Sequence, residues 1–160
     1  MIIRGYNEKD LDAMIEIWNE VVEDGIAFPQ EEMLDKFGGA AFFESQTYCG
    51  VAEGEDGQIC GLYILHPNNV GRCGHICNAS FAVRAQQRGQ HIGEALVLDC
   101  FKQAKVCGFK IIQFNAVVES NVYARRLYEK LGFIQLGTIK SGFKMKDGRY
   151  ENICPYYREL

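Results

Sequence analysis

Apolar residues along the first half of the chain fall into two spacings, which predict strands and helices in turn. MIIRGY predicts a first strand, and the residues after it repeat at the three- and four-residue spacing of a helix: Leu11, Met14, Ile15, Trp18 and Val22. Asn7 or Asp10 is suited to cap this helix. Pro29 precedes a second predicted helix, EEMLDKFGGAAFFES, which is interrupted or ends at Gly38-Gly39. TYCGVAE and QICGLYILH are two apolar runs joined by GEDG, which predicts a hairpin.

The second half repeats the change from strand to helix. PNNVGRCG predicts a loop, and HICNASFAV predicts a fourth strand that runs into the turn RGQHIG. A helix is expected from Ile92 to Gly108, followed by a fifth strand, FKIIQFNAVV. Asn121 is suited to cap the next helix, VYARRLYEKL, which ends at Gly132. FIQLGTIKSGF and GRYENICPYYREL predict a closing hairpin of two strands. This order predicts one α/β domain over residues 1–160, in which helices cover a mixed sheet.

Composition narrows the class of protein. Lys and Arg total 17 and Asp and Glu total 21, and this acidic balance argues against a nucleic-acid binder. Seven cysteines form no CxxC pair and do not combine with the three histidines at zinc spacing, so we expect reduced thiols and no metal site. MIIRGYNEKDLD lacks the apolar core of a signal peptide, and no apolar run is long enough for a membrane helix. We therefore expect a cytoplasmic protein.

The turn Arg88–Gly93, RGQHIG, lies between a predicted strand and a predicted helix. Glycine lets a ligand approach bare backbone, and the first N–H groups of a helix are unpaired and lie at the positive end of its dipole. The turn is therefore either an anion site suited to a pyrophosphate or a plain strand-to-helix connection. No Gly-Lys-Ser/Thr follows, so it is not a Walker loop, and a dinucleotide fingerprint fits poorly because a third glycine is missing.

Two segments resemble the GNAT superfamily of N-acetyltransferases. VRAQQRGQHIGEAL is similar to its acyl-CoA motif, Gln/Arg-x-x-Gly-x-Gly/Ala, although His91 stands where a glycine is usual. NVYARRLYEKLGF resembles the second hallmark, Asn-x-x-Ala-x-x-Leu-Tyr-x-x-x-Gly-Phe. Looser similarity over most of the chain points to the branch of phosphinothricin and methionine-sulfone acetyltransferases. The resemblance implies a mostly antiparallel sheet of about seven strands with about four helices, and acetyl-CoA as cosubstrate.

The resemblance also assigns roles to residues. Acetyl-CoA would be held by the fourth strand, the turn and a downstream asparagine: Phe81, Val83, Arg88, Gly89, Gln90, His91, Ile92, Gly93 and Asn121. Tyr128 would protonate the CoA thiolate, because a phenol with a pKa near 10 suits that transfer. The branch commonly has Glu-x-Ser in the fourth strand, where this chain has Asn78-Ala79-Ser80. The amine would then be deprotonated by Glu119 or by water held by Asn78 and Ser80; His75, Glu23 and Asp24 are further candidates.

The sequence gives the least information about the acceptor site, where the amine that receives the acetyl group would bind. By analogy, VVEDGIAFPQ, PNNVGRCGH and the tail hairpin would surround it, with Phe28, Tyr156 and Tyr157 as an apolar wall. Four basic residues near the tail turn are candidates for the CoA phosphate or a partner subunit: Lys140, Lys144, Lys146 and Arg149. The leading hypothesis is N-acetylation of a small-molecule amine or an amino acid analogue, in a protein that forms a homodimer as the branch commonly does. The alternatives are acetylation of a protein or peptide, and a CoA-binding sensor without turnover.

Overall fold

The computed structural model describes residues 1–160, which form one sheet and four α-helices. The helices are α1 (Leu11–Asp24), α2 (Lys36–Glu44), α3 (Ile92–Val106) and α4 (Val122–Lys130), with 3-10 turns at Glu8–Asp10, Gly71–Cys73 and Ala85–Gln87. The strands are β1 (Ile2–Gly5), β2 (Tyr48–Glu53), β3 (Ile59–Pro67), β4 (Ile76–Val83), β5 (Ile111–Val118), β6 (Ile134–Gln135), β7 (Ile139–Lys144) and β8 (Tyr150–Glu159). The strand order is β1-β2-β3-β4-β5-β8-β6, with β7 also paired to β8. The predicted mixed, mostly antiparallel sheet is confirmed.

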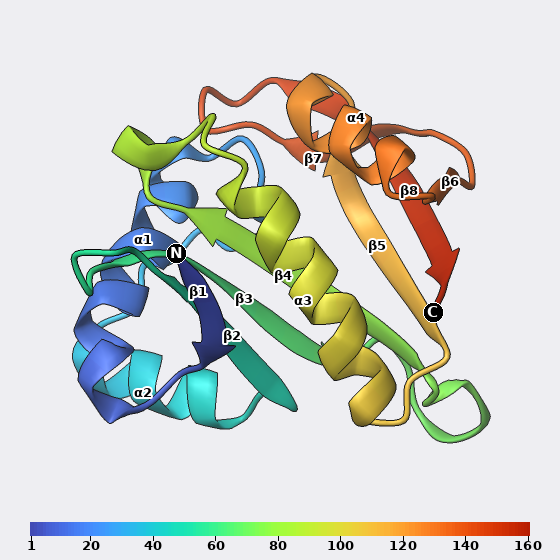
Figure 1. The fold of residues 1–160 in the computed structure, drawn as a ribbon. Helices are drawn as coiled ribbons and strands as arrows, with labels where there is room; N and C mark the ends of the chain where they lie inside the picture. Colours follow the sequence, from blue (N-terminus) through green and yellow to red (C-terminus); the bar gives the residue numbers. More distant parts are fainter.

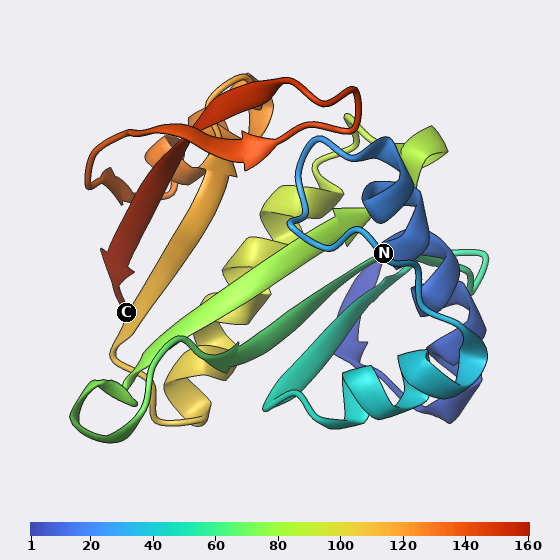
Figure 2. The same cartoon turned by 180° about the vertical axis from the view of Figure 1, so that it is seen from behind.

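The helices lie in two layers, one on each face of the sheet. α3 and α4 cover one face (Figure 1), and α1 and α2 cover the other, as the view from behind shows (Figure 2). The larger core lies under α3, where Leu96 and Cys100 are fully buried, and a second core lies under α1 around Met14 and Trp18. None of the helices combines the length and apolarity needed to cross a bilayer.

Of the two predicted caps, Asn7 is the N-cap of the 3-10 turn Glu8–Asp10 that runs into α1, and Asp10 has a different role. Asp10 precedes the helix, but its carboxylate makes no capping hydrogen bond. It accepts instead from the Asn7 N–H at 2.9 Å and pairs with Arg4 Nη1 at 2.6 Å. Arg4 also pairs with Glu53, so Asp10 and Arg4 join the start of α1 to the edge strand β1 and its neighbour β2.

The predicted second helix has the wrong boundaries. Residues 31–35 are not helical, and α2 begins at Lys36 and runs through Gly38 and Gly39. Asp35 caps it, since its Oδ1 accepts from the Gly38 N–H at 2.6 Å. The pair of glycines does not end the helix because it lies where α2 meets α1: a Cβ on Gly39 would stand 2.5 Å from Ile15 Cδ1. Close packing, which a single sequence does not reveal, explains these glycines.

The closing hairpin was predicted as two strands and contains three. Gln135 pairs with Tyr156 and Ile139 pairs with Ile153, so residues 136–138 lie opposite fewer residues of β8 and interrupt the strand. A second irregularity follows between Ile139 and Phe143. Extra residues of this kind bend a strand. Here they divide one predicted strand into β6 and β7, which both pair with β8.

All seven cysteines carry free thiols, and five of them are buried. Burial raises the pKa of Cys49 and of Cys77 to about 12, so these thiols stay neutral. The five buried cysteines pack as small apolar side chains.

Candidate active site

Two neighbouring strands separate in the middle of the sheet. β4 and β5 are parallel and pair only at Ile76 with Ile111 and at Cys77 with Ile112. Beyond these pairs β4 continues beside β3 while β5 continues beside β8, and the two strands diverge (Figure 1). We call this divergence the fork. It leaves one edge of β4 without a partner strand.

The open edge of β4 presents backbone groups at alternate residues. The Asn68 N–H donates to Ile76 O and the Arg84 N–H donates to Cys60 O, at opposite ends of the β3–β4 ladder. Because backbone groups alternate between the two edges of a strand, the even-numbered residues face β3. The N–H and C=O groups of Phe81 and Val83 therefore point into the fork. Sequence reasoning had selected both residues.

The turn that follows β4 carries a run of unpaired N–H groups. The N–H groups of residues 89–94 have no acceptor in the protein, and the first N–H in α3 with a partner is that of Ala95, which donates to His91 O. Gly89 has φ +82, and a Cβ added to it or to Gly93 would meet nothing closer than 3.9 Å. Unpaired amides at a helix N-terminus, with open space beside them, fit an anion such as a pyrophosphate.

Arg88 and His91 border the turn in different ways. Arg88 Nη2 lies 3.1 Å from Asp24 at the end of α1, and Arg88 Nε donates to Val83 O at 3.4 Å. His91 adopts the left-handed conformation with φ 60, and its side chain is 86% exposed, 3.5 Å from Glu94. Lys130, with the nearby His91, holds the pKa of Glu94 below its usual range. The His91 side chain points to solvent and is not placed as a catalytic base.

Tyr128 lies on α4 against the aromatic core of the fork. Its ring centroid is 4.6 Å from that of Phe114 and 5.5 Å from that of Phe133, and Phe114 in turn lies 5.9 Å from Phe81 on β4. The hydroxyl of Tyr128 makes no hydrogen bond within the protein, although neighbouring Tyr156 hydrogen-bonds Arg125 and Glu129. Burial raises the pKa of Tyr128 above its ordinary value of 10. The group is a neutral phenol with a free O–H.

The N-terminus of α4 is held in place by two residues. Asn121 caps the helix as predicted, since its Oδ1 accepts from the Ala124 N–H at 3.3 Å. Arg125, which sequence reasoning missed, donates to Glu119 O and to the Tyr156 hydroxyl, each at 3.1 Å. Tyr156 is fully buried. These contacts fix α4, and with it Tyr128, on β8.

The candidate bases lie in different places. Glu119 is half-buried at the end of β5, and its carboxylate accepts from Asn152 Nδ2 at 2.8 Å. His75 precedes β4 at the closed end of the fork, the opposite end of the strand from Val83. Asp24 is paired with Arg88, and Asn78 Nδ2 donates to Asn68 Oδ1 at 3.4 Å. His75 is thus separated from the turn by the whole length of β4.

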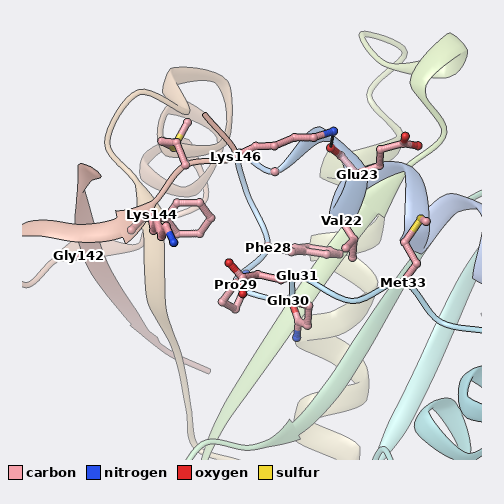
Figure 3. A pocket seen from close by; sticks show the side chains of 13 residues that line it. Val22, Glu23, Phe28, Pro29, Gln30, Glu31, Met33, Gly142, Lys144 and Lys146 are labelled. Carbon is pink, nitrogen blue, oxygen red and sulfur yellow. Dashed lines mark hydrogen bonds between the residues drawn. The ribbon is translucent and has the colours of Figure 1, made fainter. Parts of the chain in front are cut away.

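A cavity of about 570 Å³ lies between the segment after α1 and the β7–β8 hairpin (Figure 3). Phe28 and Glu23 line one wall, and Lys144 and Lys146 line the other. Lys146 Nζ donates to Glu23 O at 2.7 Å and so bridges the two walls. The loop PNNVGRCGH and both predicted wall tyrosines are absent from its lining, and Tyr156 lies in the core under α3 instead.

These features can be compared with known proteins. A family model described as "Acetyltransferase (GNAT) family" matches residues 11–133, which include β4, the turn, Asn121 and Tyr128. The chain belongs to the acetyltransferase (GNAT) family. The predicted superfamily is therefore confirmed, and the predicted enzyme class agrees with it.

Two similar proteins show how much of the chain is shared with known acetyltransferases. N-acetyltransferase aca1 of Schizosaccharomyces pombe is 38% identical over 88 residues, which are 55% of this chain and 42% of that protein. The chain thus covers less than half of that relative. A GCN5-related N-acetyltransferase from Kribbella flavida is 31% identical, with a TM-score of 0.92 over 99% of this chain and 97% of that one.

The predicted branch within the GNAT family stays a prediction. A phosphinothricin acetyltransferase from Sinorhizobium meliloti, solved in complex with acetyl-CoA, has a TM-score of 0.91 over 99% of this chain and 88% of that one. Its sequence identity is 23%, so the likeness establishes the fold alone.

Proposed function

We propose that the protein transfers the acetyl group of acetyl-CoA to the amine of a small molecule or amino acid analogue. The observation that carries the proposal is the open edge of β4, which ends directly in the turn with unpaired N–H groups. A ligand with amide groups along an extended arm could form hydrogen bonds with the edge of β4, and a pyrophosphate at one end of the ligand would meet the N–H groups of the turn. Acetyl-CoA has this form, and family membership supports it as the cosubstrate.

The proposed contacts with acetyl-CoA use backbone groups of β4 and the turn that make no backbone hydrogen bond within the protein. Phe81 and Val83 would pair with the pantetheine amides in the manner of an added strand. The N–H groups of Gly89, Gln90, His91, Ile92 and Gly93 would hold the pyrophosphate, with Arg88 at the rim. Asn121 would donate its amide N–H groups to the pantetheine arm while its oxygen caps α4.

The chemistry is a direct transfer. The neutral amine attacks the thioester carbonyl carbon, a C–N bond forms, and negative charge develops on the carbonyl oxygen. A backbone N–H of Phe81 or Val83 is suited to stabilise that charge, a contribution of about 10² to 10³ in rate. The C–S bond then breaks, Tyr128 donates its proton to the leaving thiolate, and the proton that the nitrogen loses as the amide forms restores the phenol. The aromatic contacts from Tyr128 through Phe114 to Phe81 support this role.

The acceptor ammonium must first lose a proton. Glu119 is one acceptor for it, because the hydrogen bond from Asn152 orients its carboxylate at the end of β5. Water held by Asn78 and Ser80 on β4 is the other. Comparing Glu119→Gln with Asn78→Ala separates them, because only the variant that removes the base should lower kcat at neutral pH.

A second candidate function is a CoA-binding sensor, which Asn78 favours because the resembling branch commonly has an acid there. One experiment separates the two functions: thiol release from acetyl-CoA is followed with a panel of amines, and CoA binding is measured by calorimetry. We expect release that depends on one class of amine and equals the acetylated product found by mass spectrometry. CoA binding without release for any amine would contradict the enzyme and support the sensor.

Location and assembly complete the proposal. We propose a cytoplasmic protein, which the seven unpaired thiols support. A homodimer is the assembly that the resemblance to the branch implies, and analytical ultracentrifugation tests it.

A further inference from the structure

Four carboxamide side chains gather where the fork begins. Asn78 and Gln113 directly follow the last β4–β5 pair, Cys77 with Ile112. Asn115 lies two residues further along β5, and Asn68 follows β3. We call Asn68, Asn78, Gln113 and Asn115 the amide cluster. None of its members carries a charge, and neither the sequence motifs nor the proposed acetyl-CoA contacts account for it as a group.

Hydrogen bonds within the amide cluster fix its orientation. Asn68 Oδ1 accepts from Asn115 Nδ2 at 2.6 Å and from Asn78 Nδ2 at 3.4 Å. Gln113 Nε2 donates to Asn115 Oδ1 at 3.1 Å. Both lone pairs of the Asn68 oxygen are thus used, whereas its NH₂ group has no acceptor in the protein. Asn78 and Asn115 each keep a second N–H, because a carboxamide carries two. The groups left free are the Asn68 NH₂, one N–H on each of the other three amides, and the oxygens of Asn78 and Gln113, so the amide cluster offers both donors and acceptors.

The amide cluster and the aromatic core lie on opposite faces of the sheet. Cys77, Ala79 and Phe114 pack in the core under α3. Side chains alternate along a strand, so Asn78 and Gln113 point to the other face, where Asn68 and Asn115 meet them through hydrogen bonds. On the face of the amide cluster, α1 and α2 lie toward the β1–β3 side of the sheet, which leaves the β5 side of the fork for an acceptor to approach (Figure 2).

The amide cluster is accessible to a ligand. Asn115 is exposed and the other three residues are half-buried, so no helix packs over the group. Neutral N–H donors held in place by neighbouring oxygens match an acceptor oxygen, as in a carboxylate or a carbonyl group. An oxygen bound there would hold its molecule beside the fork.

We propose that the amide cluster binds the carbonyl or carboxylate oxygen next to the acceptor amine. This inference rests on the proposed acetyl transfer and narrows its substrate to α-amino acids and their amides, including a peptide N-terminus. Simple alkylamines lack the oxygen that the amide cluster recognises.

Three acceptors that differ only at the carbon bearing the amine test this proposal: leucine, leucinamide and 3-methylbutylamine. Calorimetry with the CoA-saturated protein compares wild type, Asn115→Leu and the neighbouring control Asn69→Leu, whose side chain bonds only its own turn. Asn115→Leu should weaken leucine or leucinamide binding about tenfold or more, the loss expected for one or two hydrogen bonds. Binding of 3-methylbutylamine should stay within about twofold, and Asn69→Leu should match wild type.

The comparison of leucine with leucinamide shows whether the amide cluster recognises a carboxylate or an amide carbonyl. A loss confined to leucine indicates free amino acids, and a loss confined to leucinamide indicates amides and peptides. Wild-type binding of 3-methylbutylamine as tight as that of the other two, or identical binding by Asn115→Leu, would overturn the inference. Asn115-dependent binding without acetyl transfer to any acceptor would overturn the proposed enzyme instead and leave the amide cluster as an amino acid site.

Discussion

Tyr128 has the protonation state that its proposed role requires. Burial against Phe114 and Phe133 raises its pKa above 10, so the phenol keeps its proton at any pH where the protein is assayed. A raised pKa disfavours the phenolate, and deprotonation of Tyr128 therefore sets no alkaline limit near neutrality. Its hydroxyl is also free of competing partners within the protein.

Replacing Tyr128 by Phe removes the O–H while keeping the ring contacts. We expect kcat for acetyl transfer to fall about 100-fold, the scale of general acid catalysis, while the Kd for acetyl-CoA changes less than about twofold. Steady-state kinetics and calorimetry measure the two quantities. Equal kcat values in both proteins would exclude Tyr128 as the acid.

His91 provides a contrasting test, because its exposed side chain predicts no catalytic role. His91→Ala should keep kcat within about twofold of wild type at every pH, since the proposed pyrophosphate contact uses the backbone. His91→Gly should raise the free energy of unfolding relative to His91→Ala by about 1 kcal/mol, because only glycine adopts φ 60 without strain. Kinetics and urea denaturation measure these effects. A large rate loss in His91→Ala would contradict the exposed placement.

At the scale of elements, Asp10 joins α1 to the first two strands. The Arg4 guanidinium and the Asn7 N–H hold the pKa of this carboxyl below its usual range, and its side chain is only 4% exposed. A lowered folded-state pKa stabilises the protein above the unfolded value of about 3.9, and the stabilisation is lost as pH falls through the folded value.

We expect Asp10→Asn to lower the free energy of unfolding at pH 7 by about 3 kcal/mol, because Arg4 keeps its charge beside a neutral partner. The difference from wild type should shrink as the pH falls below about 4. Asp12→Asn in the first turn of α1 is the control, since the exposed Asp12–Lys36 pair should contribute less than about 1 kcal/mol. Denaturation at several pH values measures both. A pH-independent difference would show that Asp10 acts through packing and not through charge.

Periodicity and caps predicted most of the elements, and the resemblance to the GNAT superfamily supplied the two motifs. Met14 and Trp18 lie in the core as their spacing indicated, and Asn121 caps α4. The glycines inside α2 were misread as a helix end because Gly39 packs closely against Ile15, an effect that no local signal encodes. The amide cluster was missed because Asn68 and Asn115 are 47 residues apart in sequence and meet only through strand pairing. Gln113 and Asn115 within an otherwise apolar strand were the local sign of it.

At the scale of the whole molecule, function follows from how the sheet is divided. One part contains β1 to β4 and the other contains β5 to β8, and the sheet joins them only through the two pairs at the closed end of the fork. α3 packs against the first part and reaches Phe133 and Tyr156 of the second in one core. At the open end, Lys146 contacts Glu23 and bridges the two walls of the cavity. The division leaves one backbone edge of β4 free, while the side chains under α3 stay buried in one core.

A crystal structure of the complex with acetyl-CoA tests the central claim most directly. We predict that the pantetheine lies along β4 beside Phe81 and Val83, and that the pyrophosphate oxygens accept hydrogen bonds from the N–H groups of residues 89–93. The thioester sulfur should lie within hydrogen-bond distance of the Tyr128 hydroxyl. A pyrophosphate bound away from the turn, with β4 left unpaired, would contradict the account.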